Sequence, residues 1–312
     1  MNIPQLTVAV CTHNRAWILG DALQALLDQT SGLDNFELLV VDNASTDSTA
    51  KVAQMFAALF PFFQLVHEPA AGLSHARNTA LAAASADWVC FLDDDAKAAP
   101  DYVETALQIC RQGGFTCFGG AIRPWRRDPL PAWFLDEYES DAWRGLTQVT
   151  TLPPGQYVNG GNMIVNKQTV LATGGFDTAY GMCGAATAYG EETELQVRLR
   201  MAGHSVGYVP SLMILHYANP EKYTVRKQLE ISYKKGIAWQ KMLGDASPAA
   251  LCAIAAKLVA SPGKGVLISL RRLCKGTYRW QNALLEVVGS FLFTLGRLRA
   301  WLHMRLTGKT SR

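Results

Sequence analysis

The sequence predicts an α/β fold in which helices cover both faces of a mostly parallel β-sheet, followed by a helical extension at the C-terminal end. Two observations support this prediction. Short apolar runs alternate with helix-like segments over the first 110 residues, as in chains that build parallel sheets. The 312 residues are 49% hydrophobic and only 18% charged, which supplies a sizeable core and excludes bulk disorder.

The alternation assigns the elements of the first half in chain order. Mostly apolar runs predict strands that are buried on both faces, as parallel strands are. Segments with apolar residues three or four positions apart predict helices. Strands are expected at Leu6–Val10, Phe36–Val41, Phe63–His67 and Trp88–Leu92, and helices at Ile18–Asp28, Ser48–Phe60, Leu73–Ala84 and Tyr102–Arg111.

The middle of the chain, from about 115 to 220, is less regular. The segment Arg123–Trp143 combines prolines and tryptophans with mixed charge, which favours an ordered loop over a cleft. Gly203 is expected to end the helix that precedes it. Strands are expected at Met163–Val165, Ser205–Val209 and Met213–His216, and a helix at Glu192–Ala202.

The C-terminal region is basic and apolar. Residues 222–312 carry a net charge of +14, whereas residues 1–221 carry −11. Beyond Pro220 apolar residues recur every four positions, which predicts helices. In Asn282–Leu306 apolar residues at three- and four-residue steps accompany arginines, a pattern typical of an amphipathic helix in a membrane interface. Docking of this segment on the acidic body is the alternative.

The same composition bears on the compartment. The start MNIPQLTVAVC has no basic region before its apolar run, so we expect no secretory signal. The longest apolar run near the C-terminus, Val287–Gly296, is about ten residues, short of the roughly 20 of a spanning helix. Seven cysteines without a CxxC pair predict free thiols in a reducing compartment. We therefore expect a cytoplasmic protein.

Polar clusters follow three of the predicted strands. They are Thr12-His13-Asn14-Arg15, Asp42–Asp47 and Asp93-Asp94-Asp95. Ligands of such sheets bind beyond the carboxyl ends of the strands. Three adjacent carboxylates repel one another, so the last cluster predicts a divalent cation, Mg²⁺ or Mn²⁺, with a solvated turn as the alternative.

A second acidic cluster opens the predicted helix after Gly190. Glu191, Glu192 and Glu194 in a first helical turn can be ordinary complements of the helix dipole, or one of them can be a general base that points into the cleft. Gly160-Gly161-Asn162 precedes a strand and allows backbone to approach a ligand closely.

Taken together, the motifs resemble the family 2 glycosyltransferases over about residues 5–220. Each motif is weak by itself, but six of them occur in the family's order. They are Val8–Arg15, Val40–Asp47, Gly72–Asn78, Phe91–Asp95, Gly174–Asp177 and Gly190–Leu199. The resemblance implies a Rossmann-like GT-A fold, a nucleotide-diphosphate sugar as donor, a divalent cation and inversion at the anomeric carbon.

The resemblance also implies roles for residues of this chain. Asp42 would read the base, Asp95 would ligate the metal, and Asp93 and His216 would assist there. Glu192 would be the base, although the family usually has Glu-Asp where this chain has Glu191-Glu192, which leaves the choice open. The expected nucleotide-binding residues are Thr12, Asn14, Arg15, Asp42, Arg77, Asp93 and Asp94. Donor sugar or acceptor is expected at Gly161, Asn162 and Trp125.

The implied organisation has a GT-A catalytic domain at 1–220, with a nucleotide-binding half at about 1–115 and an acceptor half at about 116–220. Residues 221–312 would be a basic amphipathic extension. The implied activity is transfer of a sugar to a hydroxyl of a saccharide or lipid-linked acceptor in envelope or exopolysaccharide synthesis. The extension would hold the enzyme peripherally on the inner face of an anionic membrane.

Other classes of protein can be judged by the sequence motifs that each one requires. A nicotinamide dehydrogenase needs GxGxxG after its first strand, where this chain has Thr12–Arg15. Nucleic-acid binding by the basic tail lacks a recognised motif, so no nucleic-acid partner is expected. A sugar nucleotidyltransferase and a non-catalytic nucleotide-sugar-binding module remain alternatives.

Overall fold

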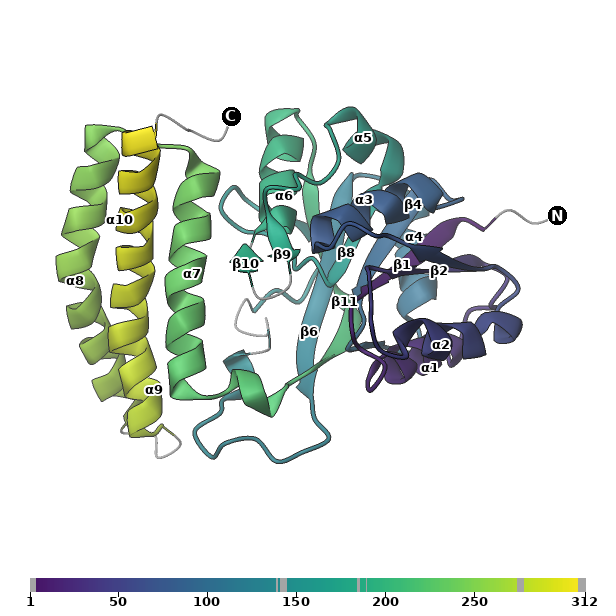
Figure 1. Ribbon diagram of the computed structural model, residues 1–312, viewed down its shortest axis with the longest axis horizontal. Coiled ribbons are helices and arrows are strands. Elements are labelled where there is room, and N and C mark those ends of the chain that lie inside the picture. The colour runs from purple at the N-terminus through teal and green to yellow at the C-terminus, as the bar shows by residue number, and fades with distance from the viewer. Residues whose placement is uncertain are drawn as a thin grey trace. The chain divides into compact units, whose positions relative to one another are not determined.

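The computed structural model describes residues 4–138, 140, 145–183, 186–188, 190–273 and 278–307. The chain forms two compact units (Figure 1). The sheet unit comprises residues 1–125, 139–186 and 191–217, and the helical unit comprises 126–138, 187–190 and 218–312. The boundaries near residues 115 and 220 stay predictions.

A nine-stranded sheet organises the sheet unit. Its strands run in the order β3-β2-β1-β4-β8-β6-β11-β5, with β7 paired to β11. The pairs β1–β2, β2–β3, β1–β4 and β6–β11 are parallel, and β8 lies antiparallel between β4 and β6. The mostly parallel sheet is confirmed. The strands are β1 (Leu6–Thr12), β2 (Phe36–Asp42), β3 (Phe63–His67), β4 (Trp88–Asp93), β5 (Ala96–Ala98), β6 (Cys117–Trp125), β7 (Thr150–Thr151), β8 (Asn162–Asn166) and β11 (Val206–Tyr217).

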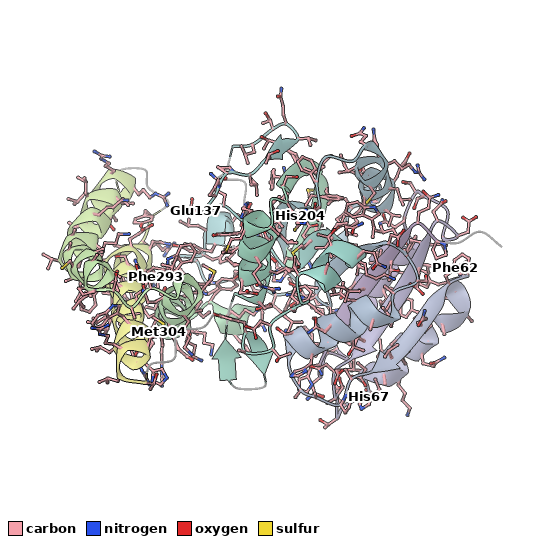
Figure 2. The ribbon with its side chains drawn as sticks, turned by 90° about the horizontal axis from the view of Figure 1, so that it is seen from above. Phe62, His67, Glu137, His204, Phe293 and Met304 are labelled. Carbon is pink, nitrogen blue, oxygen red and sulfur yellow. The ribbon has the colours of Figure 1, made fainter. Side chains whose placement is uncertain are left out.

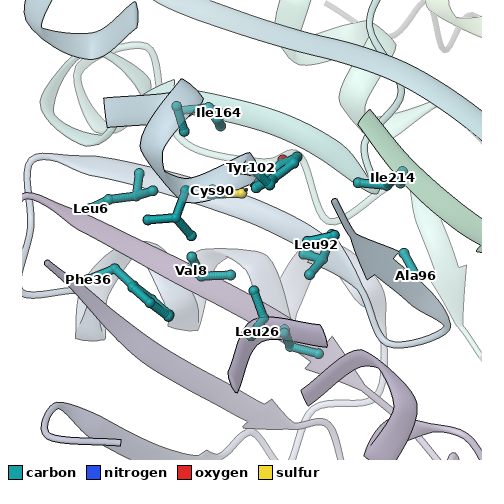
Figure 3. Close-up of a cluster of buried hydrophobic side chains, with 14 of the residues drawn as sticks. Leu6, Val8, Leu26, Phe36, Cys90, Leu92, Ala96, Tyr102, Ile164 and Ile214 are labelled. Atoms are coloured by element: carbon teal, nitrogen blue, oxygen red, sulfur yellow. Dashed lines mark hydrogen bonds between the residues drawn. The ribbon is translucent and has the colours of Figure 1, made fainter. Parts of the chain in front are cut away.

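Helices cover both faces of this sheet, as the alternation predicts (Figure 1). Successive residues of a strand point to opposite faces, so β1 and β2 need apolar side chains at nearly every position. Figure 3 shows the core on one face, where Leu6, Val8 and Phe36 pack. The helices and turns of the unit are α1 (Leu19–Leu27), α2 (Thr49–Met55), η1 (Ala57–Leu59), α3 (Leu73–Ala83), α4 (Tyr102–Gln112), α5 (Lys167–Ala172) and α6 (Glu191–Met201); the short strand β9 (Gly181–Cys183) precedes β10 (Ala186–Ala188).

The irregular middle contains more strand than the sequence predicted. The separate strands expected at Ser205–Val209 and Met213–His216 form one strand, β11, whose register shifts between Val209 and Ile214. Pro210 between them resembles a turn signal but marks this irregularity instead. Arg123 to Trp125 belong to β6 rather than to a loop. Residues 139 and 141–143 of that expected loop, which runs to Trp143, lie outside the described residues.

The helical unit is built from α7 (Val225–Leu243), α8 (Pro248–Leu273), α9 (Trp280–Leu284), the π-helical turn η5 (Leu285–Gly289) and α10 (Ser290–Thr307), with short turns η2 (Asp136–Tyr138) and η4 (Pro220–Lys222). Glycines let α7 and α10 pack at close range: a Cβ on Gly236 would overlap the Phe293 carbonyl, and one on Gly296 would overlap the Tyr233 carbonyl. Figure 2 labels Phe293 on α10.

The segment Asn282–Leu306, expected to be one amphipathic helix in a membrane interface, is divided among α9, η5 and α10 and is partly packed within the helical unit. Phe291, Leu302 and Leu306 remain exposed, so its membrane contact stays a prediction. The Arg297 guanidinium donates a hydrogen bond from Nε to Gln240 Oε1 at 3.0 Å, and Trp301 and Met304 are buried (Figure 2). Three- and four-residue spacing identifies an apolar helix face but cannot tell whether protein or lipid covers it.

One of the described helices, α8, is long and apolar enough by length and composition to cross a membrane. Uninterrupted apolar runs in the sequence did not reveal this helix, because Lys257 and Lys264 interrupt its apolar stretch. Its average hydropathy nevertheless stays high enough for a candidate membrane span.

Candidate active site

Asn14 joins the loops that follow β1 and β2. It adopts a positive φ of 54°, a conformation that asparagine tolerates better than most residues. Its Oδ1 accepts a hydrogen bond from the backbone N–H of Thr46 at 2.8 Å, and its own N–H donates to Ser45 Oγ at 2.9 Å. Asn14, predicted to bind nucleotide, therefore shapes the loops at this edge of the sheet.

Asp42 ends β2 at the same edge and is largely buried. Its Oδ1 accepts a hydrogen bond from the Ser45 N–H at 3.2 Å, and its Oδ2 lies 3.8 Å from His67 Nδ1 (Figure 2 labels His67). The neighbouring Asn43 ties the loop after β3 by accepting from the Gly72 N–H at 2.8 Å. Strand order thus brings the first two predicted clusters together.

Asp93, Asp95 and His216 form the densest acidic cluster of the described residues. Asp93 ends β4, and β5 turns back to pair with β11 so that Ala96 lies opposite His216. His216 Nε2 is 3.2 Å from Asp95 Oδ1 and 3.6 Å from Asp93 Oδ2. One ligand atom from each of the three lies within 4.8 Å of the others, a spacing that can hold a metal ion.

Arg15 approaches this cluster from the loop after β1. Its Nε lies 3.7 Å from Asp94 Oδ1, and one of its terminal nitrogens lies 3.8 Å from Asp95 Oδ2. Burial raises the pKa of Asp94 to about 7 despite Arg15, and the negative charge of Asp95 adds to the effect. Burial therefore outweighs the attraction of Arg15 for the Asp94 carboxylate. Thr12 ends β1 beside the cluster and is buried.

Trp125 lies against the same cluster from the end of β6. Its Nε1 donates a hydrogen bond to the Asp95 carbonyl at 3.2 Å. Its ring packs on Tyr217 with a centroid separation of 5.1 Å, and Lys97 Nζ lies 3.8 Å from its ring centroid. Contact with a sugar stays a prediction for Trp125; the observed contacts hold the turn that carries Asp95.

Gly161 lies directly against the Asp93 side chain. The Asp93 N–H donates to the Gly161 carbonyl at 3.2 Å, and a Cβ on Gly161 would overlap the Asp93 carboxylate. The Asn162 side chain is fully buried, and its expected contact with donor or acceptor stays a prediction. Its Oδ1 accepts from the Tyr102 hydroxyl at 2.7 Å, and its Nδ2 donates to the Leu212 carbonyl at 3.0 Å. Asn162 joins strands in the core.

Arg77 has a different partner from the predicted nucleotide. Its side chain is buried, and its Nη1 donates to Glu191 Oε1 at 2.8 Å. The guanidinium carbon lies 5.7 Å from the Phe91 ring centroid and 5.4 Å from that of Phe176. The contact with Glu191 is a buried ion pair between α3 and the start of α6, and the expected nucleotide contact of Arg77 stays a prediction. Sequence reasoning missed this pair, which joins positions 114 apart.

Two side chains hold the turn at Gly174-Gly175 by hydrogen bonds to its backbone. Asn78 on α3 accepts from the Phe176 N–H at 2.8 Å and donates to its carbonyl at 2.8 Å. Arg198 on α6 donates to the Gly175 carbonyl at 2.6 Å. Gly175 has a φ of 70°, and a Cβ there would lie 2.8 Å from Asn78 Oδ1. The turn therefore fixes α3 and α6 relative to each other.

Glu192 lines a pocket of about 280 Å³ in the sheet unit. Burial is the largest cause that raises the pKa of Glu192 to about 7; the charge of Glu191 contributes to the rise and Arg77 opposes it. Because Arg77 pairs directly with Glu191, the two adjacent carboxylates have different surroundings. A carboxylate whose pKa lies near neutrality suits a group that accepts a proton.

The rest of the pocket wall was not predicted. Gln196 positions it: the side chain is fully buried, accepts from the Val158 N–H at 2.9 Å and donates to the Val158 carbonyl at 2.9 Å. Asn159 links the pocket to the acidic cluster by accepting from the Gly161 N–H at 2.8 Å. The polar, glycine-containing run before β8 was the available signal. The lining residues besides Glu192 are Gly155, Gln156, Tyr157, Val158, Asn159 and Thr193.

Solved structures share this fold. The mannosyltransferase PcManGT from Pyrobaculum calidifontis, in complex with GDP-Man and Mn²⁺, matches with a TM-score of 0.64 at 20% identity, over 98% of this chain and 88% of that one. S. aureus TarS 1–349 in complex with UDP-GlcNAc matches with a TM-score of 0.51 at 14% identity, over 99% of this chain and 93% of that one. The fold is therefore GT-A, as expected.

Curated relatives match parts of the chain. Validoxylamine A glucosyltransferase of Streptomyces hygroscopicus subsp. jinggangensis is 35% identical over 107 residues, which cover 34% of this chain and only 25% of that protein. Glycosyltransferase AglE of Haloferax volcanii is 22% identical over 76% of this chain and 75% of its own length. The family model for glycosyl transferase family 2 matches residues 7–172, more than half of the chain. Its fold, its ordered motifs and this match make the chain a member of glycosyltransferase family 2.

Proposed function

We propose that this glycosyltransferase moves a sugar from a nucleotide-diphosphate donor to a hydroxyl of a saccharide or lipid-linked acceptor, with inversion. The observation that carries the proposal is the pairing of two acidic sites in one unit. Asp93, Asp95 and His216 gather at the strand ends, and Glu192 lines a separate pocket. Asn159 and Gly161 connect the two sites through one short loop.

The first site fits a divalent cation. Two carboxylates and an imidazole suit Mn²⁺, and carboxylates alone suit Mg²⁺. Asp95 is only 4% exposed and lies beside two further acids, so its negative charge favours a bound cation. PcManGT, which shares the fold, was solved with Mn²⁺. When bound, such an ion would stabilise negative charge on a leaving diphosphate.

The second site fits a general base. Arg77 neutralises Glu191 and leaves Glu192 as the carboxylate on the pocket wall, which favours Glu192 for this role. Glu192 takes the proton from an acceptor hydroxyl. The hydroxyl oxygen then bonds to the anomeric carbon while the bond to the diphosphate oxygen breaks on the opposite side, so the configuration inverts.

The nucleotide is proposed to lie along the ends of β1, β2 and β4. Thr12, Arg15, Asp42 and Asp94 line this edge, where ligands of such sheets bind. Asn14 supports the edge by holding two loops together. GDP-Man and UDP-GlcNAc are the donors bound to the two solved structures, so both belong in the first screen.

We propose a cytoplasmic setting at the inner face of a membrane. The net charge of +14 over residues 222–312 supports this, since the cytoplasmic leaflet is the anionic one. Lipid-linked acceptors of envelope or exopolysaccharide synthesis would be reached at that surface.

A donor screen tests the proposed activity. Purified protein is incubated with Mn²⁺ and each nucleotide-diphosphate sugar, and release of nucleoside diphosphate is measured with and without chelator. Asp95→Asn should abolish release while the protein stays folded, and Glu104→Gln on exposed α4 surface serves as a matched acid-to-amide control. Full activity in chelator would refute the metal requirement. Formation of a nucleotide-sugar from sugar phosphate and nucleoside triphosphate would instead identify a nucleotidyltransferase.

A further inference from the structure

Helix α8 presents a long apolar surface to solvent. An 18-residue window of the helix has a mean hydropathy of 1.5, and only 11% of that window is buried. Core helices of soluble proteins with similar hydropathy bury most of their side chains. The helix contains no Asp or Glu. We therefore expect the exposed apolar surface of α8 to be covered by a binding partner.

The exposed apolar face of α8 differs from its packed face. Ile254, Gly265 and Ser269 are its buried residues, and Gly265 lies against the backbone of Glu286. At about 100° per residue, Val259, Leu267 and Leu270 point roughly 110° or more away from the mean direction of these buried residues, and Val266 and Leu273 lie at the border between the two faces. The exposed apolar side chains are Val259 at 83% exposure, Leu270 at 58%, Leu267 at 50%, Val266 at 47% and Leu273 at 44%.

Three cations line one edge of this apolar face. Lys257, Lys264 and Arg271 are all exposed and stand seven residues apart. Seven residues correspond to about two helical turns and a rise of roughly 10.5 Å, so the three charges form a line along the helix axis. An apolar face bordered by a row of basic residues is typical of helices that lie in a membrane interface.

We propose that α8 binds an anionic lipid surface with its axis in the membrane plane, and that it is the lipid-binding element of the helical unit. Val259, Leu267 and Leu270 enter the acyl boundary, while Lys257 and Lys264 reach lipid phosphates along its edge. This deepens the proposed membrane association and rests on it. It assigns the lipid contact to α8, a different helix from the Asn282–Leu306 segment, where the sequence placed it.

The charge pattern decides between lying on the membrane and crossing it. A spanning orientation would place Lys257 and Lys264 in hydrocarbon, where charged side chains are strongly disfavoured. An in-plane orientation lets all three cations meet headgroups at once. Each contributes about 1 kcal/mol near an anionic surface.

The matching experiment measures binding of the full chain to vesicles of phosphatidylcholine, with and without phosphatidylglycerol, by co-sedimentation. The wild type should pellet with the anionic vesicles at low salt and partly release at high salt. The triple variant Lys257→Gln, Lys264→Gln and Arg271→Gln should bind anionic vesicles roughly 100-fold more weakly. Leu267→Ser with Leu270→Ser should also weaken binding, and both positions are exposed enough to leave folding intact.

A charge-matched control locates the effect. Arg226→Gln, Lys235→Gln and Arg305→Gln remove three exposed cations from α7 and α10, and should lower affinity by less than about threefold because distant charges are screened. Equal losses in both triple variants would overturn the assignment to α8. Salt-insensitive association with neutral vesicles would overturn the in-plane orientation in favour of a spanning helix.

Donor cleavage measured without vesicles separates this inference from the proposed function. The α8 variants should release nucleoside diphosphate at the wild-type rate in solution, because the altered residues lie in the helical unit. Wild-type cleavage together with unaltered vesicle binding in the α8 triple variant refutes the lipid role of α8 alone. Absence of cleavage in the wild type refutes the proposed reaction and leaves the vesicle result to stand by itself.

Discussion

Glu191→Gln tests whether, of the two adjacent glutamates at the start of α6, Glu191 forms the structural ion pair with Arg77 and Glu192 is the base. Glu191 Oε1 accepts a hydrogen bond from Arg77 at 2.8 Å, and the two side chains are 7% and 3% exposed. Breaking a buried ion pair by removing one charge costs about 3–5 kcal/mol, because the other charge stays buried without compensation. Glutamine keeps an oxygen for the guanidinium, so we expect the lower end, about 3 kcal/mol, in urea unfolding.

The same variant should retain chemistry and shift its pH dependence. The negative charge of Glu191 raises the pKa of Glu192, so removing it lowers that pKa. A base works when deprotonated, so the acidic limb of the kcat/KM profile should move from about pH 7 to lower pH, with the plateau above it preserved.

Two comparisons make this reasoning refutable. The double variant Arg77→Met with Glu191→Gln should be more stable than Arg77→Met alone, since Arg77→Met alone leaves the Glu191 carboxylate buried without its direct cation. Glu192→Gln should lose turnover by roughly 10²–10⁴-fold and keep donor affinity. If Glu191→Gln is inactive at every pH while Glu192→Gln turns over, the assignment of the base is reversed.

Three further outcomes follow from the site. Gly161→Ala should displace the Asp93 carboxylate and weaken Mn²⁺ binding in calorimetry, whereas Gly263→Ala, which meets no neighbour within 4 Å, should not; equal affinities would contradict the close approach. The pKa of Glu192 is higher in the folded protein than in the unfolded chain, so the stability of the wild type relative to Glu192→Gln should fall as the pH rises from about 4.5 to about 7, and then level off. A stability difference that does not change with pH in thermal unfolding would count against the raised pKa. Asn162→Leu should lower the free energy of unfolding by at least about 2 kcal/mol, because it leaves buried polar groups unpaired. The KM for the donor should be unchanged in the soluble fraction; a raised KM at full stability would support the predicted contact of Asn162 with a sugar.

Local sequence patterns were sufficient to predict the sheet and the edge of the sheet at which its ligands bind. Continuous apolar runs predicted β1, β2 and β4, because strands covered on both faces need apolar side chains at every position. Parallel strands end at one edge, so the polar residues after each were expected to meet there, as Asn14 and Asp42 do through Ser45. The register of β11 against β5 was not predictable, yet it brings His216 to Asp95.

Tertiary structure alone decided what covers each polar or apolar group. Arg77 was assigned to nucleotide from its motif, but its partner Glu191 lies 114 positions away, and no local pattern specifies that distance. Asn162 reads as a site residue beside two glycines, although strand pairing buries it. The helices of the extension make the same point, because α8 and Asn282–Leu306 are both apolar and basic. Periodicity defines a face, but burial depends on the surface packed against it, and that surface comes from distant parts of the chain.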